Sequence, residues 1–167
     1  MTLAAPCASL RSNMTTAPTT LRPQQSNLGL PILVGGAVAG TFDLIAAFVT
    51  FGPGVPRAIA GGLLGRSAFQ GGPGTYILGI VLHYFIAFAA AAIYCLASRR
   101  LPFLIEHFFV CGLFYGIAIY LVMNLIVLPL SALHFMGPYQ YRGLLQGILI
   151  HMFIIGLPIS LALRRMS

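Results

Sequence analysis

Charged residues are scarce in this sequence. They make up 7% of the 167 residues, as two acids, nine arginines and no lysine, whereas about a quarter of a typical soluble chain is charged. So few charges cannot cover a water-facing surface, and 59% of the residues are apolar. The composition therefore excludes a soluble enzyme, a disordered chain and a disulfide scaffold, and it indicates an integral membrane protein.

The shortage of acids leaves a net charge of +7, which in a soluble protein would suggest nucleic-acid binding. All nine arginines, however, lie outside the most apolar stretches, as membrane-flanking charges do. We therefore expect the lipid bilayer as partner and no nucleic acid. Cys7, Cys95 and Cys111 have no CxxC spacing, so we interpret them as small apolar residues rather than metal ligands.

Four apolar stretches are long enough to cross a bilayer, which takes about 20 helical residues. Backbone groups in lipid must be satisfied internally, and continuous rather than alternating apolar runs favour helices over strands. The predicted fold is an all-α integral membrane four-helix bundle, with a polar N-terminal tail over 1–27 and a membrane domain over 28–167. The predicted spans are Leu28–Phe51, Thr75–Ala97, Phe103–Leu128 and Gly143–Leu163.

The arginines also predict an orientation. We call side A the side on which the first span begins and the last span ends, and side B the opposite side. Six arginines fall on side A and three on side B, so the positive-inside rule predicts that side A, with both termini, is cytoplasmic. We expect the location to be the inner membrane of a bacterium. The side-B segment 52–74, bracketed by Gly-Pro-Gly turns, is expected to hold a short helix against the bundle.

The chain also contains an internal repeat. The segment 79–86, Gly-Ile-Val-Leu-His-Tyr-Phe-Ile, aligns without gaps on 147–154, Gly-Ile-Leu-Ile-His-Met-Phe-Ile, and places His83 opposite His151. Each copy follows a helix with a GxxxG motif and ends in two arginines. We therefore expect two parallel two-helix hairpin repeats, related by an axis along the membrane normal.

Small residues predict the helix contacts. We expect six glycines to face neighbouring helices, because they allow backbones to approach closely: Gly36, Gly40, Gly112, Gly116, Gly143 and Gly147. These faces also allow self-association, for which a homodimer is one option.

Polar residues within the spans are the candidate site: four lie at one depth, eight residues from the side-B end of each predicted span, and Asn124 lies one turn nearer side B. They share helix faces with the predicted packing glycines, so we expect them to face one another: Asp43, His83, Tyr120, Asn124 and His151. Intramembrane ionisable groups are costly and point to function. We expect no enzyme activity, since no nucleophile–base pair stands out.

Three interpretations of this cluster remain open. The first is proton- or ion-coupled movement, in which Asp43 holds charge and the two histidines exchange protons. The second is a haem or metal ion bound by His83 and His151, although no cofactor is the simpler expectation. The third is a structural role as interhelical hydrogen-bonding groups.

Residues 79–165 resemble the YagU-like bacterial inner-membrane proteins. The similarity begins with the His83 segment, which runs into Ala92-Ile93-Tyr94-Cys95, and continues with Leu101-Pro102 and the glycine-rich third helix. It ends with Leu128-Pro129-Leu130 and a last helix in which a glycine precedes His151 by four residues and two arginines follow near the end. The resemblance implies a family of unknown molecular activity linked to acid tolerance, with no catalytic residues to carry over. This chain departs from it in the segment 52–74 and in its short side-B loops.

Overall fold

The computed structural model describes residues 28–135 and 140–166, and these residues form helices and no strand. The prediction of an all-α bundle is confirmed. The predicted polar tail, 1–27, lies outside the described residues.

Four helices are long and apolar enough to cross a membrane: Gly29–Phe51, Pro73–Ser98, Phe108–Leu130 and Tyr141–Met166. The first two are α1 and α3. The third span comprises α5 (Phe108–Val122), a π-helical turn η2 (Met123–Val127) and α6 (Leu128–Leu130). The fourth span comprises α7 (Tyr141–Ile150), a π-helical segment η3 (His151–Gly156) and α8 (Leu157–Met166). The prediction that the third span begins at Phe103 is wrong. His107 leaves helical geometry at φ −105° and ψ 40°, which separates the short helix α4 (Phe103–Glu106) from α5.

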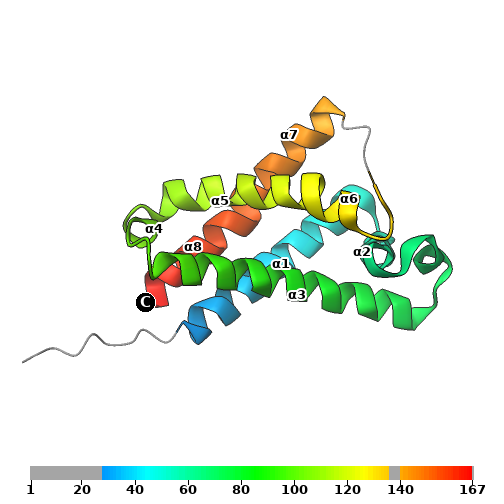
Figure 1. Ribbon diagram of the computed structural model, residues 1–167, viewed down its shortest axis with the longest axis horizontal. Helices are drawn as coiled ribbons and strands as arrows, with labels where there is room; N and C mark the ends of the chain where they lie inside the picture. Colours follow the sequence, from blue (N-terminus) through cyan, green and yellow to red (C-terminus); the bar gives the residue numbers. More distant parts are fainter. Residues whose placement is uncertain (1–27, 136–139, 167) are drawn as a thin grey trace, which may run out of the picture.

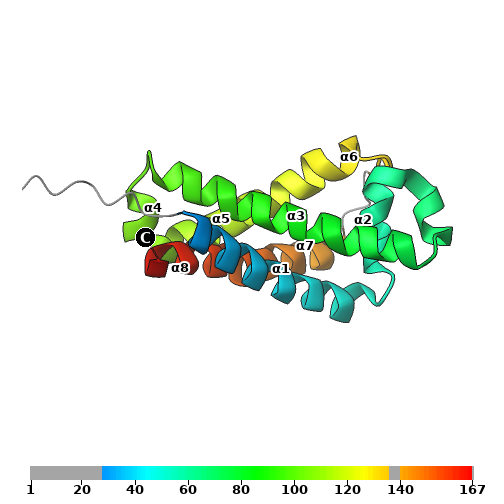
Figure 2. The same cartoon turned by 90° about the horizontal axis from the view of Figure 1, so that it is seen from below.

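Helix α1 lies between two neighbours and packs against both α3 and α8, while α5 packs against η3 and α8. The start of α1, the end of α8 and the short α4 lie at one end of the molecule, which is side A, and α2 and α6 lie at the other (Figures 1 and 2). The apolar side chains that these contacts leave exposed ring the bundle, as expected for helices that face lipid.

Glycines in α1 and α5 bring the helices together at all four positions predicted there. A Cβ added at Gly36 or Gly40 would meet Phe88, Ala87 or Tyr84 of α3. A Cβ added at Gly112 or Gly116 would meet the backbone of η3, with Ser160 also close to Gly112. Without a hydrophobic driving force between helices in lipid, such close packing is the main source of their attraction.

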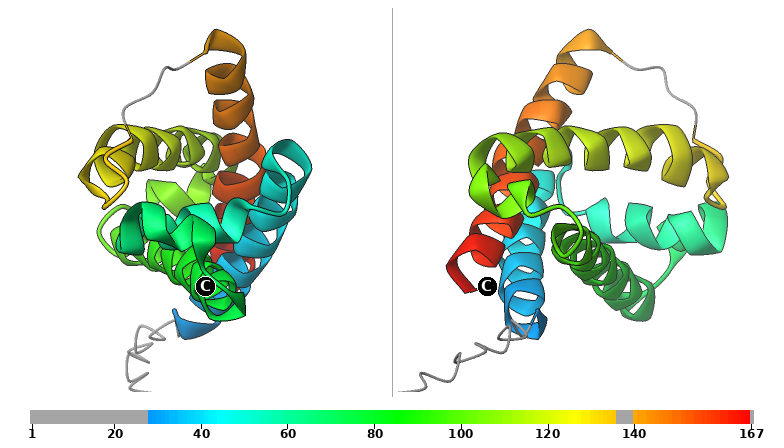
Figure 3. Two further views of the ribbon diagram at one scale, coloured as in Figure 1. Left: turned by 90° about the vertical axis from the view of Figure 1, so that its right-hand side faces the viewer. Right: turned by 60° about the vertical axis from the view of Figure 1, so that its left-hand side comes forward.

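The other two glycines, both in α7, behave differently. Gly147 is covered by the Tyr120 ring, whereas a Cβ at Gly143 would have nothing within 4 Å. The prediction that Gly143 packs against a neighbouring helix is therefore wrong for the described part of the chain. The reason is the direction of α7, which projects away from the other helices (Figure 3).

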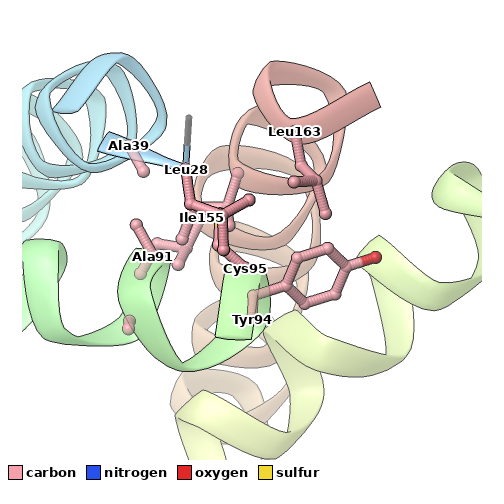
Figure 4. Close-up of a cluster of buried hydrophobic side chains, with 9 residues drawn as sticks. Leu28, Ala39, Ala91, Tyr94, Cys95, Ile155 and Leu163 are labelled. Carbon is pink, nitrogen blue, oxygen red and sulfur yellow. The ribbon is translucent and has the colours of Figure 1, made fainter. Parts of the chain in front are cut away.

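The best-packed region lies toward side A, where α1, α3 and the last span meet. Its buried side chains are Leu28, Ala39, Ala90, Ala91, Tyr94, Cys95, Ile155, Ile159 and Leu163. Figure 4 shows Tyr94 beside the aliphatic members, with its hydroxyl pointing away from them. Cys95 is a buried free thiol, in line with its interpretation as a small apolar residue.

The segment between the first two long helices folds onto side B as α2 (Val55–Leu64) and a 3₁₀ turn η1 (Gly65–Gln70). Gly79 of α3 allows the backbone of Pro56 to lie directly against it. Arg57 donates from Nε to the carbonyl oxygen of Gly71 at 3.1 Å and lies over the Tyr76 ring. The predicted short helix thus packs against α3.

The two hairpins differ in detail. Helices α1 and α3 are continuous α-helices, whereas both helices of the second hairpin contain a π-helical segment. Contact between the hairpins is also uneven, because α1 packs on α8 while α3 and α5 are not closely packed. The parallel-hairpin repeat remains a prediction from the sequence.

Candidate functional site

Asp43 and His151 are brought together by the packing of α1 against η3. Both side chains are half-buried, and the Asp43 carboxylate is near enough to the His151 imidazole for their charges to interact. Asp43 lies eight residues before Phe51, the last residue of α1, or about 12 Å along the helix axis at 1.5 Å per residue. A carboxylate and an imidazole at this depth ease the cost of burying each other's charge.

The His151 ring is held in one orientation. Its Nδ1 lies 2.9 Å from the carbonyl oxygen of Gly147, and its ring centroid lies 5.1 Å from that of Tyr120, in an edge-on arrangement. A carbonyl oxygen can only accept a hydrogen bond, so Nδ1 carries the hydrogen and Nε2 carries the lone pair in the neutral ring. Nε2 is therefore the atom that can take up a proton.

His83 is held in a similar way at a different place. Its Nε2 donates to the carbonyl oxygen of Gly40 on α1 at 2.8 Å, which leaves the Nδ1 lone pair to accept a proton. Beside it, the hydroxyls of Tyr84 and Thr41 lie 2.9 Å apart and link α3 to α1.

The predicted meeting of both histidines and the carboxylate is only partly found. Asp43 and His151 interact, but within 28–135 and 140–166 no three His, Cys, Asp or Glu side chains are close enough together to hold a metal ion. His83 therefore does not complete such a cluster with them. Equal depth along the helices does not determine the direction in which each side chain points.

Tyr120 and Asn124 belong to the third span, whose helix α5 packs against η3. Tyr120 is buried and covers Gly147, and the Asn124 side-chain amide donates to the carbonyl oxygen of Tyr120 at 2.9 Å. Together with Leu144, both line a small, partly open cavity of about 50 Å³ between the third span and α7, and its lining surface is apolar.

The π-helical segments are a feature that sequence reasoning missed. η2 ends two residues before Pro129, and η3, which starts at His151, ends two residues before Pro158. In each, the residue before the proline donates its N–H to a carbonyl five residues earlier: Leu128 to Met123 and Leu157 to Met152. Proline lacks an N–H and its ring clashes with the carbonyl four residues earlier, so a local widening accommodates it. The two Leu-Pro steps were the available signal, and such widened turns occur often at functional sites.

Between η3 and side B, the last span, here helix α7, diverges from its neighbours. Its α8 and η3 segments pack on α1 and α5, but α7 has little contact with α1 (Figures 1 and 3). Residues 140–146 are all exposed, and a 3.5 Å contact between Gln146 and Thr50 bridges α7 and α1. Asp43 and His151 thus lie where the divergence begins, with the packed apolar core on their side-A side.

Comparison with known proteins gives no relative to guide the interpretation. No protein-family model matches the sequence, and no curated protein and no solved structure matches it either.

Proposed function

We propose that this chain is a multi-pass membrane protein that moves protons or small cations, with Asp43 and His151 as its binding site. The observation that carries the proposal is that the packing of α1 against η3 brings two half-buried ionisable side chains, Asp43 and His151, into one region at the point where α7 separates from α1. Asp–His pairs within membranes act as proton relays, and imidazole titrates near neutral pH.

The packing on the two sides of the site supports access from side B. Toward side A, the apolar cluster that includes Ala39, Ile155 and Ile159 is buried and would block water. Toward side B, α7 diverges from α1 and carries the exposed polar residues Arg142 and Gln146. A proton arriving from side B would bind Nε2 of His151, with the Asp43 carboxylate stabilising the imidazolium. Release to side A then requires a change in helix packing, for which the widened turn η3 is the natural hinge.

We further propose that side A faces the cytoplasm of a bacterial cell. Among the described residues, the side-A ends carry Arg99, Arg100, Arg164 and Arg165, and side B carries three arginines, Arg57, Arg66 and Arg142. Under the positive-inside rule, side B, where α7 diverges from α1, then faces the outer side of the inner membrane. The proposed similarity to YagU-like proteins, with their link to acid tolerance, agrees with such a site.

The haem- or metal-binding alternative makes a different prediction. To coordinate one haem or metal ion, His83 and His151 would both have to point a ring nitrogen at it. Each ring is instead hydrogen-bonded to a carbonyl oxygen on a different helix, that of Gly40 for His83 and that of Gly147 for His151. We therefore expect the purified protein to contain no stoichiometric metal and no visible chromophore. Absorption in the haem Soret region would overturn the proton-site proposal.

Proteoliposomes test the proposal, with internal pH followed by a dye under an imposed pH gradient. Asp43→Asn and His151→Ala should lower proton flux at least tenfold, to the level of protein-free vesicles, because each removes one member of the pair. The chain offers a matched control for each, since the second acid, Glu106, and the neighbouring His107 are exposed at side A.

Glu106→Gln and His107→Ala should leave the flux within about twofold of the wild type, as expected for exposed residues outside the site. Wild-type flux equal to that of empty vesicles, or equal to that of Asp43→Asn, would refute the proposal. Unchanged flux together with destabilised variants would indicate the structural role instead.

A further inference from the structure

A groove separates the side-A halves of α3 and α5. These helices are not closely packed, and their aromatic contact is the pair Tyr94 and Tyr115, with ring centroids 4.9 Å apart. Next to this pair lies a partly open cavity of about 370 Å³, bounded by α3, α4 and α5. Its size falls in the range of pockets that take small ligands.

The two tyrosines hold the groove open. The Tyr115 hydroxyl donates to the carbonyl oxygen of Ala90 at 2.7 Å, and the Tyr94 hydroxyl donates to that of Leu104 at 3.0 Å. Each phenol is thus fixed between two helices, and Figure 4 shows the Tyr94 ring extending from α3 beyond the packed core. The groove is therefore preformed, and its walls cannot collapse without breaking these bonds.

The walls of the groove suit an apolar occupant. Lining side chains include Ala97, Phe103, Leu104 and Phe114, and the lining surface is almost entirely apolar. The groove lies within two apolar spans, on the side of the bundle where Phe114 is 67% exposed. In a bilayer, a lipid acyl chain is the occupant that this lining favours.

The charge at the side-A end of the groove is positive. Arg99 and Arg100 form the turn that directly follows Ser98, the last residue of α3, and both are exposed. Arg164 and Arg165 are exposed at the end of α8, and the one acid among the described side-A residues is Glu106. Basic groups beside a gap between helices on the cytoplasmic side favour anionic phospholipid headgroups.

We propose that this groove is a binding site for an anionic phospholipid. One acyl chain lies between α3 and α5 against Tyr94, Tyr115 and Phe114, and the headgroup phosphate is bound by Arg99 and Arg100. The site is separate from Asp43 and His151 and does not depend on their role in transport.

The absence of tryptophan from the chain allows a direct test. Phe114→Trp places the chain's single tryptophan, which can be excited selectively, in the groove, and Phe85→Trp, on an exposed face of α3, serves as the matched control. Each reporter is reconstituted in vesicles that contain brominated phosphatidylglycerol or brominated phosphatidylcholine, whose bromines quench tryptophan on contact. We expect the groove reporter to show at least a threefold preference for phosphatidylglycerol, and the Phe85→Trp control to show none.

The preference should be lost in the double variant Arg99→Gln/Arg100→Gln and retained in Arg66→Gln/Arg142→Gln, which removes two exposed arginines on side B. Equal quenching of the groove reporter by both lipids would overturn the proposal. The absence of quenching by either lipid would overturn it too, because protein, such as a second copy of the chain, would then cover the groove.

Discussion

Replacing Gly116 by alanine should destabilise the contact that positions His151. An added Cβ would meet the carbonyl group of His151 and would lie 2.6 Å from its carbonyl carbon and from the Met152 Cα. Carbon atoms prefer separations of about 3.5–4.0 Å, so α5 and η3 must move apart by about 1 Å. The obstructing atoms are backbone, which cannot be relieved by a rotamer change.

The expected cost follows from this geometry. Overpacking of a close contact typically costs about 1–3 kcal/mol, which corresponds to an unfolding equilibrium shifted by roughly 5- to 150-fold. Gly143→Ala is the matched control, because it makes the same substitution in a neighbouring span with nothing within 4 Å of the new methyl group. At an exposed helical position the change should be neutral, or should stabilise by about 0.4–1 kcal/mol.

The free energies of unfolding can be measured by titrating mixed micelles with a denaturing detergent while helicity is followed by circular dichroism. The reasoning requires Gly116→Ala to be the less stable variant by at least about 1 kcal/mol. Equal midpoints for the two variants would refute the close approach of α5 to η3, and with it the account of how His151 is oriented.

Three further results are expected. Tyr115→Phe removes the hydroxyl that donates to the carbonyl oxygen of Ala90. It should lower the free energy of unfolding by about 0.6 kcal/mol, the mean for interhelical hydrogen bonds in membranes. An unchanged free energy of unfolding would show that this bond does not stabilise the bundle. Gly79→Ala places a methyl group against the Pro56 backbone and should expose α2 to proteolysis, whereas Gly74→Ala, which has open space around it, should not. Proton flux in proteoliposomes should be unchanged by a metal chelator, and its loss would indicate a metal-dependent site.

The positions of the spans could be predicted because they depend on local properties. A continuous apolar run of sufficient length must be helical in lipid, whatever the neighbours are. The contact roles of Gly36, Gly40, Gly112 and Gly116 were also predictable, since a row of glycines four residues apart creates a flat helix face. The break at His107 was missed although Glu106 and His107 form a polar pair within the apolar run, because a polar pair near the end of a span is equally compatible with a continuous helix that leaves the membrane there.

The partners of the polar residues could not be predicted in the same way. Helical spacing gives a residue's depth and its neighbours on the same helix. How close each histidine lies to Asp43 depends instead on the tilt and rotation of each helix. The prolines change both, since the π-helical segments before Pro129 and Pro158 shift the faces of the residues around them. The open position of Gly143 has the same origin, because α7 is directed away from the bundle beyond η3.

The amino-acid sequence alone therefore determined that this protein is a helical membrane bundle, where its spans run and which of its few ionisable groups lie within them, because transfer of each segment into lipid is a local free energy. Only the tertiary structure decided that α1 packs against η3, which brings Asp43 and His151 into one region, and that the bundle is packed toward side A and divergent toward side B. Those features arise from how the helices pack on one another, and packing is a property of the whole set of contacts rather than of any one segment.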